Sequence, residues 1–152
     1  GSINVGGDGQ VQGVDLDFPT YTWTETHIVA DADVDDTYKG ALYAVATSPI
    51  NDASFMGFAA GEVKFMGVEG SQRGRGGDWE LNFKFAASPN TTSLTVGTLT
   101  SIVKKGWEYL WVYFNEAVVS VGSDKARAVT VRDVYVEQVY ASSDFSTLGI
   151  GT

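Results

Sequence analysis

The sequence predicts a mostly β protein: an antiparallel β-sandwich or barrel of about seven or eight strands with one packed α-helix. Several segments alternate apolar and polar residues, which is the period of a half-buried strand. One segment, Val34–Ala46, instead repeats its apolar residues at spacings of three and four, as an amphipathic helix does. The 18 glycines among 152 residues suit a β-rich fold with many turns.

Composition indicates a globular chain with one sizeable core. Hydrophobic residues make up 43% and aromatic residues 12% of the sequence. Residues 1–13 are glycine-rich and lack periodicity, so we expect an extended arm there, followed by a single β-rich domain over residues 14–152. The arm residues expected to contact a neighbouring subunit are Val5, Gly6, Gly7 and Val11.

The charge and the cysteine count narrow the possible partners. The net charge of −9 disfavours sequence-specific binding of nucleic acid, whose phosphates repel an acidic protein. The absence of cysteine removes disulfides, thiolate nucleophiles and cysteine metal sites. No apolar run reaches the roughly 18 residues that a membrane-spanning helix needs, so no membrane partner is expected.

The first half of the chain predicts two strand segments and the helix. Val14–Pro19 alternates apolar and acidic residues, and Thr20–Ala30 is rich in β-branched and aromatic residues. The helix can be capped by Asp35 or Asp36 and ends before Pro49. Its apolar stripe consists of Val34, Tyr38, Ala41, Leu42 and Val45.

A hairpin follows, with a strand over Glu62–Val68 and a second strand that begins at Trp79. In the second strand, large apolar residues occupy every other position: Trp79, Leu81, Phe83 and Phe85. The connection, Glu69–Asp78, is polar and glycine-rich and should project from the sheet. It is either an ordinary surface loop or an assembly loop that contacts another subunit through Arg73, Gly74, Arg75 and Gly76.

The second half contains the most apolar strand, Trp107–Phe114, after a long connection or weak strands over Ala87–Gly106. We expect a turn region over Asn115–Ala126, a long strand over Ala128–Tyr140, and a helical turn over 143–148. One face of the apolar strand carries Trp107, Tyr109, Trp111 and Tyr113. These aromatic residues either fill the core or, if exposed, stack sugar rings.

Neither catalysis nor a cofactor is predicted. His27 is the only histidine and has no nucleophile motif near it, so an enzyme is not expected. Asp31, Asp33 and Asp35 have the spacing that begins a calcium loop, but the required glycine and the closing glutamate are replaced by Asp36 and Leu42. A solvated helix start explains these acids, and no metal site is predicted.

Three runs resemble phage- and prophage-encoded virion structural proteins: GDWELNFKFAASPNTT from Gly77, KKGWEYLWVYF from Lys104, and VYVEQVYASSDFSTLGIG from Val134. The general plan is similar to that of tail-tube subunits. The resemblance implies a non-enzymatic subunit that self-assembles into a ring, tube or filament of a virion or extracellular particle. Its partners would be copies of itself and other virion proteins. The alternative is a carbohydrate-binding β-sandwich that uses Trp107 and Trp111.

Overall fold

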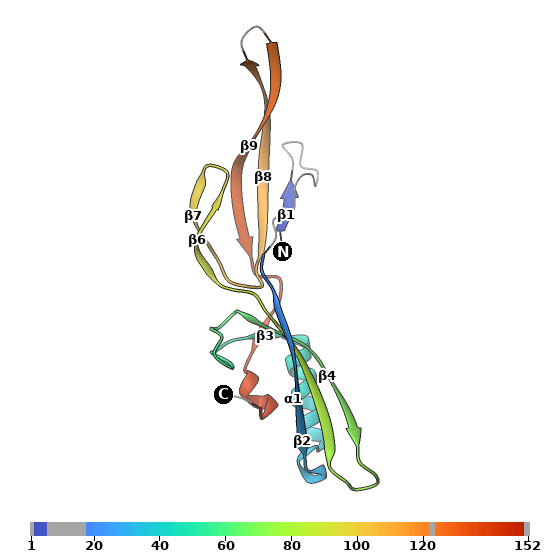
Figure 1. Ribbon diagram of the computed structural model, residues 1–152. Coiled ribbons are helices and arrows are strands. Elements are labelled where there is room, and N and C mark those ends of the chain that lie inside the picture. Colours follow the sequence, from blue (N-terminus) through green and yellow to red (C-terminus); the bar gives the residue numbers. More distant parts are fainter. Residues whose placement is uncertain (1, 6–17, 122–123, 151–152) are drawn as a thin grey trace. The chain divides into compact units, whose positions relative to one another are not determined.

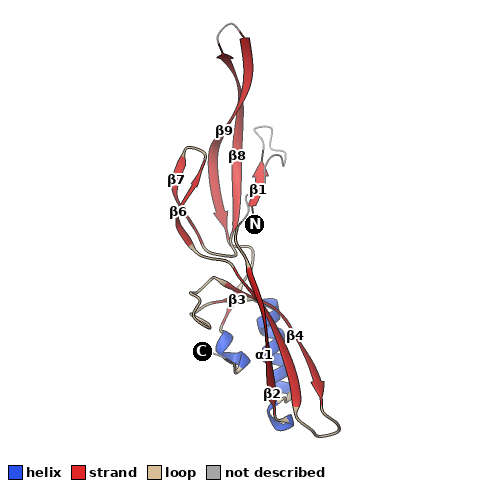
Figure 2. Cartoon of the chain, viewed as in Figure 1, coloured by secondary structure: helices blue, strands red, loops and turns tan. Residues whose placement is uncertain are grey.

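The computed structural model describes residues 2–5, 18–121 and 124–150, with side chains described for 18–113 and 133–150. The mostly β class with one α-helix is confirmed, and the sheets of the described residues are open rather than closed into a barrel (Figures 1 and 2). The sequence predicts one domain over 14–152, whereas the contacts group the chain into two compact units. Unit 1 comprises Gly1–Phe18 and Thr91–Val139, and unit 2 comprises Pro19–Asn90 and Tyr140–Thr152.

Unit 2 is built on a five-stranded sheet with the strand order β10-β3-β4-β5-β2. Strand β5 lies between two long antiparallel neighbours, because its alternating apolar residues can be buried along its whole length. Leu81, Phe83 and Phe85 of β5 are buried, as their spacing predicts. The strands are β2 (Tyr21–Val29), β3 (Ile50–Asn51), β4 (Val63–Gln72), β5 (Trp79–Ala87) and β10 (Ser142–Ser143).

The apolar face of this sheet is covered by the helix α1 (Asp36–Thr47) and by the short 3-10 helix η2 (Phe145–Leu148) (Figure 1). A second 3-10 helix, η1 (Asp31–Asp33), precedes α1. Asp35 caps α1 by accepting a hydrogen bond from the backbone N–H of Tyr38 at 2.8 Å, as expected for an N-cap. Val45 of α1 is buried in the core, and Leu42 packs against it.

The β4–β5 hairpin is longer than the sequence predicts, and its loop is shorter. Strand β4 continues to Gln72, so the first four residues of the predicted loop Glu69–Asp78 are paired with β5. Only the residues at the tip of the hairpin form a turn. The Arg73 N–H closes this turn by donating a hydrogen bond to the Asp78 carbonyl at 2.9 Å. The predicted loop is therefore corrected to its last six residues: small and polar residues remain in a strand when a long partner strand lies beside them.

Unit 1 contains a three-stranded sheet with the order β1-β8-β9 and a separate β6–β7 hairpin. The predicted turn region Asn115–Ala126 is wrong, because β8 and β9 run through it and pair in register from Asn115 to Val121. For Ala87–Gly106 the sequence predicts a long connection or weak strands, and the strands are confirmed by the β6–β7 pair. The bounds are β1 (Ser2–Val5), β6 (Thr91–Val96), β7 (Leu99–Lys104), β8 (Tyr109–Val121) and β9 (Asp124–Glu137).

The core of unit 1 lies on one face of the β8–β9 hairpin. Leu110 and Val112 of β8 are buried there together with Val96 of β6. Val134 and Val136 of β9 pack beside them. Since side chains alternate along a strand, the residues between these positions point to the opposite face of the sheet.

Lys104, at the end of β7, is buried although it is a lysine. Only 1% of its surface is exposed, its Nζ donates a hydrogen bond to the Gly106 carbonyl at 2.8 Å, and the same atom lies 4.2 Å from the ring centre of Phe18. Burial lowers the pKa of Lys104, and the nearby Glu108 carboxylate opposes this shift. The protonated side chain is thus held in place by one carbonyl and one ring.

Because the folded-state pKa of Lys104 is lowered, the folded protein binds this proton less tightly than the unfolded chain does. The free energy of unfolding of the wild type should therefore rise with pH between that lowered pKa and the usual lysine pKa of about 10.4, relative to a Lys104→Met variant. Urea unfolding of both proteins across this range measures the difference. A difference that stays constant with pH would contradict the assignment.

Candidate assembly and binding surfaces

The face of the β8–β9 hairpin opposite the core carries a group of aromatic side chains. Trp111 on β8 lies directly opposite Tyr135 on β9, and Tyr113 and Glu137 flank this pair diagonally. The indole N–H of Trp111 donates a hydrogen bond to the Glu137 carboxylate at 3.1 Å. The rings of Tyr113 and Tyr135 are 5.4 Å apart and nearly perpendicular, at 88°. We call these four residues the aromatic surface.

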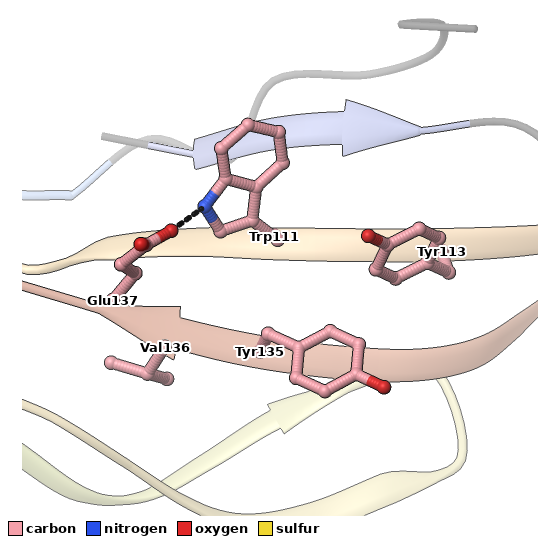
Figure 3. A pocket seen from close by; sticks show the side chains of 5 residues that line it. All are labelled: Trp111, Tyr113, Tyr135, Val136 and Glu137. Carbon is pink, nitrogen blue, oxygen red and sulfur yellow. Dashed lines mark hydrogen bonds between the residues drawn. The ribbon is translucent and has the colours of Figure 1, made fainter. Parts of the chain in front are cut away.

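Together with Val136, the aromatic surface lines a shallow concavity of about 530 Å³, around which the five side chains lie as Figure 3 shows. Tyr135 is 57% exposed, and Trp111 and Tyr113 are half-buried. The expectation that this aromatic row fills the core is thus wrong for Trp111 and Tyr113, because Leu110 and Val112, which alternate with them, occupy the core face instead.

The two tryptophans named for carbohydrate binding are not brought together. Trp107 lies in the turn before β8 and does not line the concavity, whereas Trp111 does. The sequence predicts that Trp107 and Trp111 share one strand face, but strand β8 begins only at Tyr109, so Trp107 precedes it. Trp111 has Tyr135 as its neighbour instead, and this residue comes from the other strand.

The predicted assembly loop is the tip of the β4–β5 hairpin. Gly74 and Gly76 have φ angles of +74° and +72°, in the left-handed region that glycine adopts without strain. The Arg73 guanidinium lies 3.4 Å from the Glu80 carboxylate of the same hairpin, so it has a partner within its own chain. Arg75 is exposed at the tip.

The predicted assembly arm is described only at its beginning. Val5 ends β1 and pairs with Tyr113 of β8, so residues 2–5 add a parallel strand to the chain's own sheet. Gly6, Gly7 and Val11 lie outside the described residues, as do the first four residues of the predicted strand Val14–Pro19.

Strand β2 forms one edge of the five-stranded sheet, and no described strand pairs with its outer side. We call this outer side the β2 edge. The strand has nine residues and pairs with β5 through nine consecutive positions without a bulge. Its sequence, YTWTETHIV, contains no proline, glycine or lysine. Long, regular edges of this kind are ready to accept another strand.

Strand β2 also carries the single histidine of the sequence, His27. His27 Nε2 lies 3.0 Å from the Glu25 carboxylate, and its ring meets Phe83 edge to face. Neither contact supplies a nucleophile. Among the described residues, no group of three or more acidic or histidine side chains could hold a metal ion. The described helices include none that is long and apolar enough to span a membrane.

Comparison with protein-family models, with curated proteins and with solved structures finds no match for the chain.

Two features of these surfaces are absent from the sequence predictions. Tyr135 is part of the aromatic surface, and the only signal for it is the alternation of Val134 and Val136 around it. The position of β2 at a sheet edge has no local signal, because its residues suit a central strand equally well.

Proposed function

We propose that this protein is a non-enzymatic structural subunit that self-assembles into a ring, tube or filament, as in a phage tail or tail-like particle. The observation that carries the proposal is the β2 edge. Its nine residues leave backbone N–H and C=O groups available to a strand of a neighbouring copy. The function is also the one implied by the sequence resemblance, and it places the protein in a virion or extracellular particle.

The β2 edge differs from the other three terminal strands of the two larger sheets, β1-β8-β9 and β10-β3-β4-β5-β2. Strand β10 has only two residues, and β1 has four. Strand β9 is long, but its sequence contains Lys125, Arg127 and Arg132. Basic residues on edge strands are a common means of preventing unwanted pairing. Among these four terminal strands, β2 is thus the one that is long and contains neither lysine nor arginine.

A head-to-tail contact through this edge would generate an extended assembly. If the β2 edge pairs with a different surface of the next copy, each added copy presents a new β2 edge. The contact closes into a ring or continues as a filament, depending on the rotation between copies. The exposed Arg75 at the β4–β5 tip would make a second contact between copies, in this case an electrostatic one. A chain with a net charge of −9 offers many carboxylates with which this arginine can pair.

The double variant Thr26→Lys/Ile28→Lys tests the proposal. Both side chains are exposed on β2 and lie opposite Asn82 and Glu80 of β5, so lysines there should be compatible with the fold. Two lysines on the edge should prevent strand addition and leave the protein monomeric. Light scattering and negative-stain electron microscopy of the concentrated protein measure the outcome.

The matched control is Ala44→Lys/Ala46→Lys, which adds the same charge at exposed positions of α1. It should assemble as the wild type does, because lysines near the end of a helix leave the fold and the β2 edge unchanged. A wild type that remains monomeric at every concentration would overturn the proposed function. An edge variant that assembles as well as the control would show that the contact lies elsewhere.

A further inference from the structure

The aromatic surface combines aromatic rings with negative charge. On the face that contains it, β8 and β9 place two further residues in the same register: Tyr109 opposite Glu137, and Asp133 opposite Tyr113. The described side chains of this face thus include four aromatic rings and two carboxylates, and they include neither lysine nor arginine. A ligand for this surface should therefore present apolar groups to the aromatic rings and should carry no negative charge.

The orientation of the rings distinguishes between two classes of ligand. A sugar stacks flat on an exposed ring, and rows of rings that bind oligosaccharides need their faces aligned. Tyr113 and Tyr135 are instead nearly perpendicular, at 88°, with the edge of one ring toward the face of the other, so the two rings share no stacking plane. An exposed ring face is electron-rich and attracts a cation placed within about 6 Å of its centre.

The Glu137 carboxylate supplies the matching charge. One of its oxygens accepts the hydrogen bond from the Trp111 indole at 3.1 Å, which positions both the carboxylate and the ring at the margin of the concavity. Carboxylate oxygens have several lone pairs, so this bond leaves capacity for an electrostatic contact with a ligand.

We propose that the aromatic surface binds an organic ammonium cation, such as a quaternary or methylated ammonium group carried by a larger molecule. Tyr113, Tyr135 and Trp111 would surround the cation, and Glu137 would balance its charge. The concavity of about 530 Å³ is large enough for the ammonium group together with part of the molecule that carries it. The inference does not depend on self-assembly, because all four residues come from one hairpin of one chain.

The test compares choline with its neutral carbon isostere 3,3-dimethylbutan-1-ol, which has the same shape without the charge. Isothermal titration calorimetry of the full-length chain at constant ionic strength should show saturable binding of choline and much weaker binding of the isostere. Tyr135→Ala should weaken choline binding by about 2- to 30-fold, the range expected for one cation–π contact. Glu137→Gln keeps an acceptor for the Trp111 indole and should also weaken binding.

The matched control is Tyr43→Ala, which removes a 72% exposed tyrosine from α1 and should leave choline binding unchanged. Circular dichroism of each variant confirms that it is folded. Equal binding of choline and the isostere, or no saturable binding of choline, would overturn the inference. Saturable binding of neutral oligosaccharides in place of choline would support the carbohydrate-binding alternative instead.

Discussion

Phe85→Ala is expected to lower the free energy of unfolding of unit 2 by about 3–5 kcal/mol, the range for truncating a buried phenylalanine. Phe85 is 1% exposed, and its ring is the common neighbour of five others. The ring centres lie 5.3 to 6.4 Å from it, in Trp23, Phe55, Phe65, Phe83 and Phe145. Removing the Phe85 ring leaves a cavity. The neighbouring rings cannot all move to fill it, because four of them are held by other strands, loops or helices.

Urea unfolding followed by the helical signal in circular dichroism measures this loss, because α1 lies in unit 2. Tyr43→Ala is the control: the same kind of truncation on an exposed side chain should change the free energy of unfolding by less than about 0.5 kcal/mol. A loss below about 1 kcal/mol for Phe85→Ala would mean that this ring is not the centre of the core.

Asn51→Leu should have the second-largest effect, a loss of about 3 kcal/mol or more. Asn51 is 1% exposed and organises the chain between β3 and β4 with its side-chain amide. Its Nδ2 donates to the carbonyls of Ala53 and Ala59 at 2.7 and 3.0 Å. Its Oδ1 accepts from the N–H groups of Gly61 and Val63 at 3.1 and 2.9 Å.

Leucine has a similar volume but can make none of these bonds. The Gly61 N–H keeps the Asn51 backbone carbonyl as a partner, and the Ala59 carbonyl keeps the Glu62 N–H. The buried Val63 N–H loses its side-chain acceptor, which costs about 1–3 kcal/mol, and the other three lost hydrogen bonds add about 0.5–1.5 kcal/mol each. Asn82→Leu is the matched control, since Asn82 bonds to Thr26 on the solvent-facing side of the same sheet. Its loss should be about 1 kcal/mol or less. Equal losses in the two variants would show that water replaces the Asn51 amide.

The sequence was sufficient to predict those elements whose structure is reflected in a local residue pattern. Alternation identified β5 and its buried phenylalanines, and helical spacing identified α1, with Asp35 and Asp36 as the two candidates for its cap. Both patterns arise because one face of the element is buried, whatever lies on that face. For the same reason, the mostly β class with one helix followed from periodicity and glycine content alone.

The strand ends were predicted less well, because pairing depends on a distant partner. Residues 69–72, EGSQ, have a composition typical of loops, whereas residues 115–121, NEAVVSV, contain three valines and begin with two polar residues. Both segments are strands because a long partner lies beside each of them. The cost of ordering these residues is offset by ladder hydrogen bonds, which no local pattern reveals. Strand extension is thus a property of the pair of strands.

The candidate surfaces were decided only by the tertiary structure. The register between β8 and β9 places Tyr135 beside Trp111, and a shift of one residue would turn it to the core face. The order of the strands leaves β2 at an edge, although its residues would suit the centre of a sheet. Residue pattern determines which face of a strand is apolar, whereas long-range pairing determines which strand lies at an edge and which side chains meet.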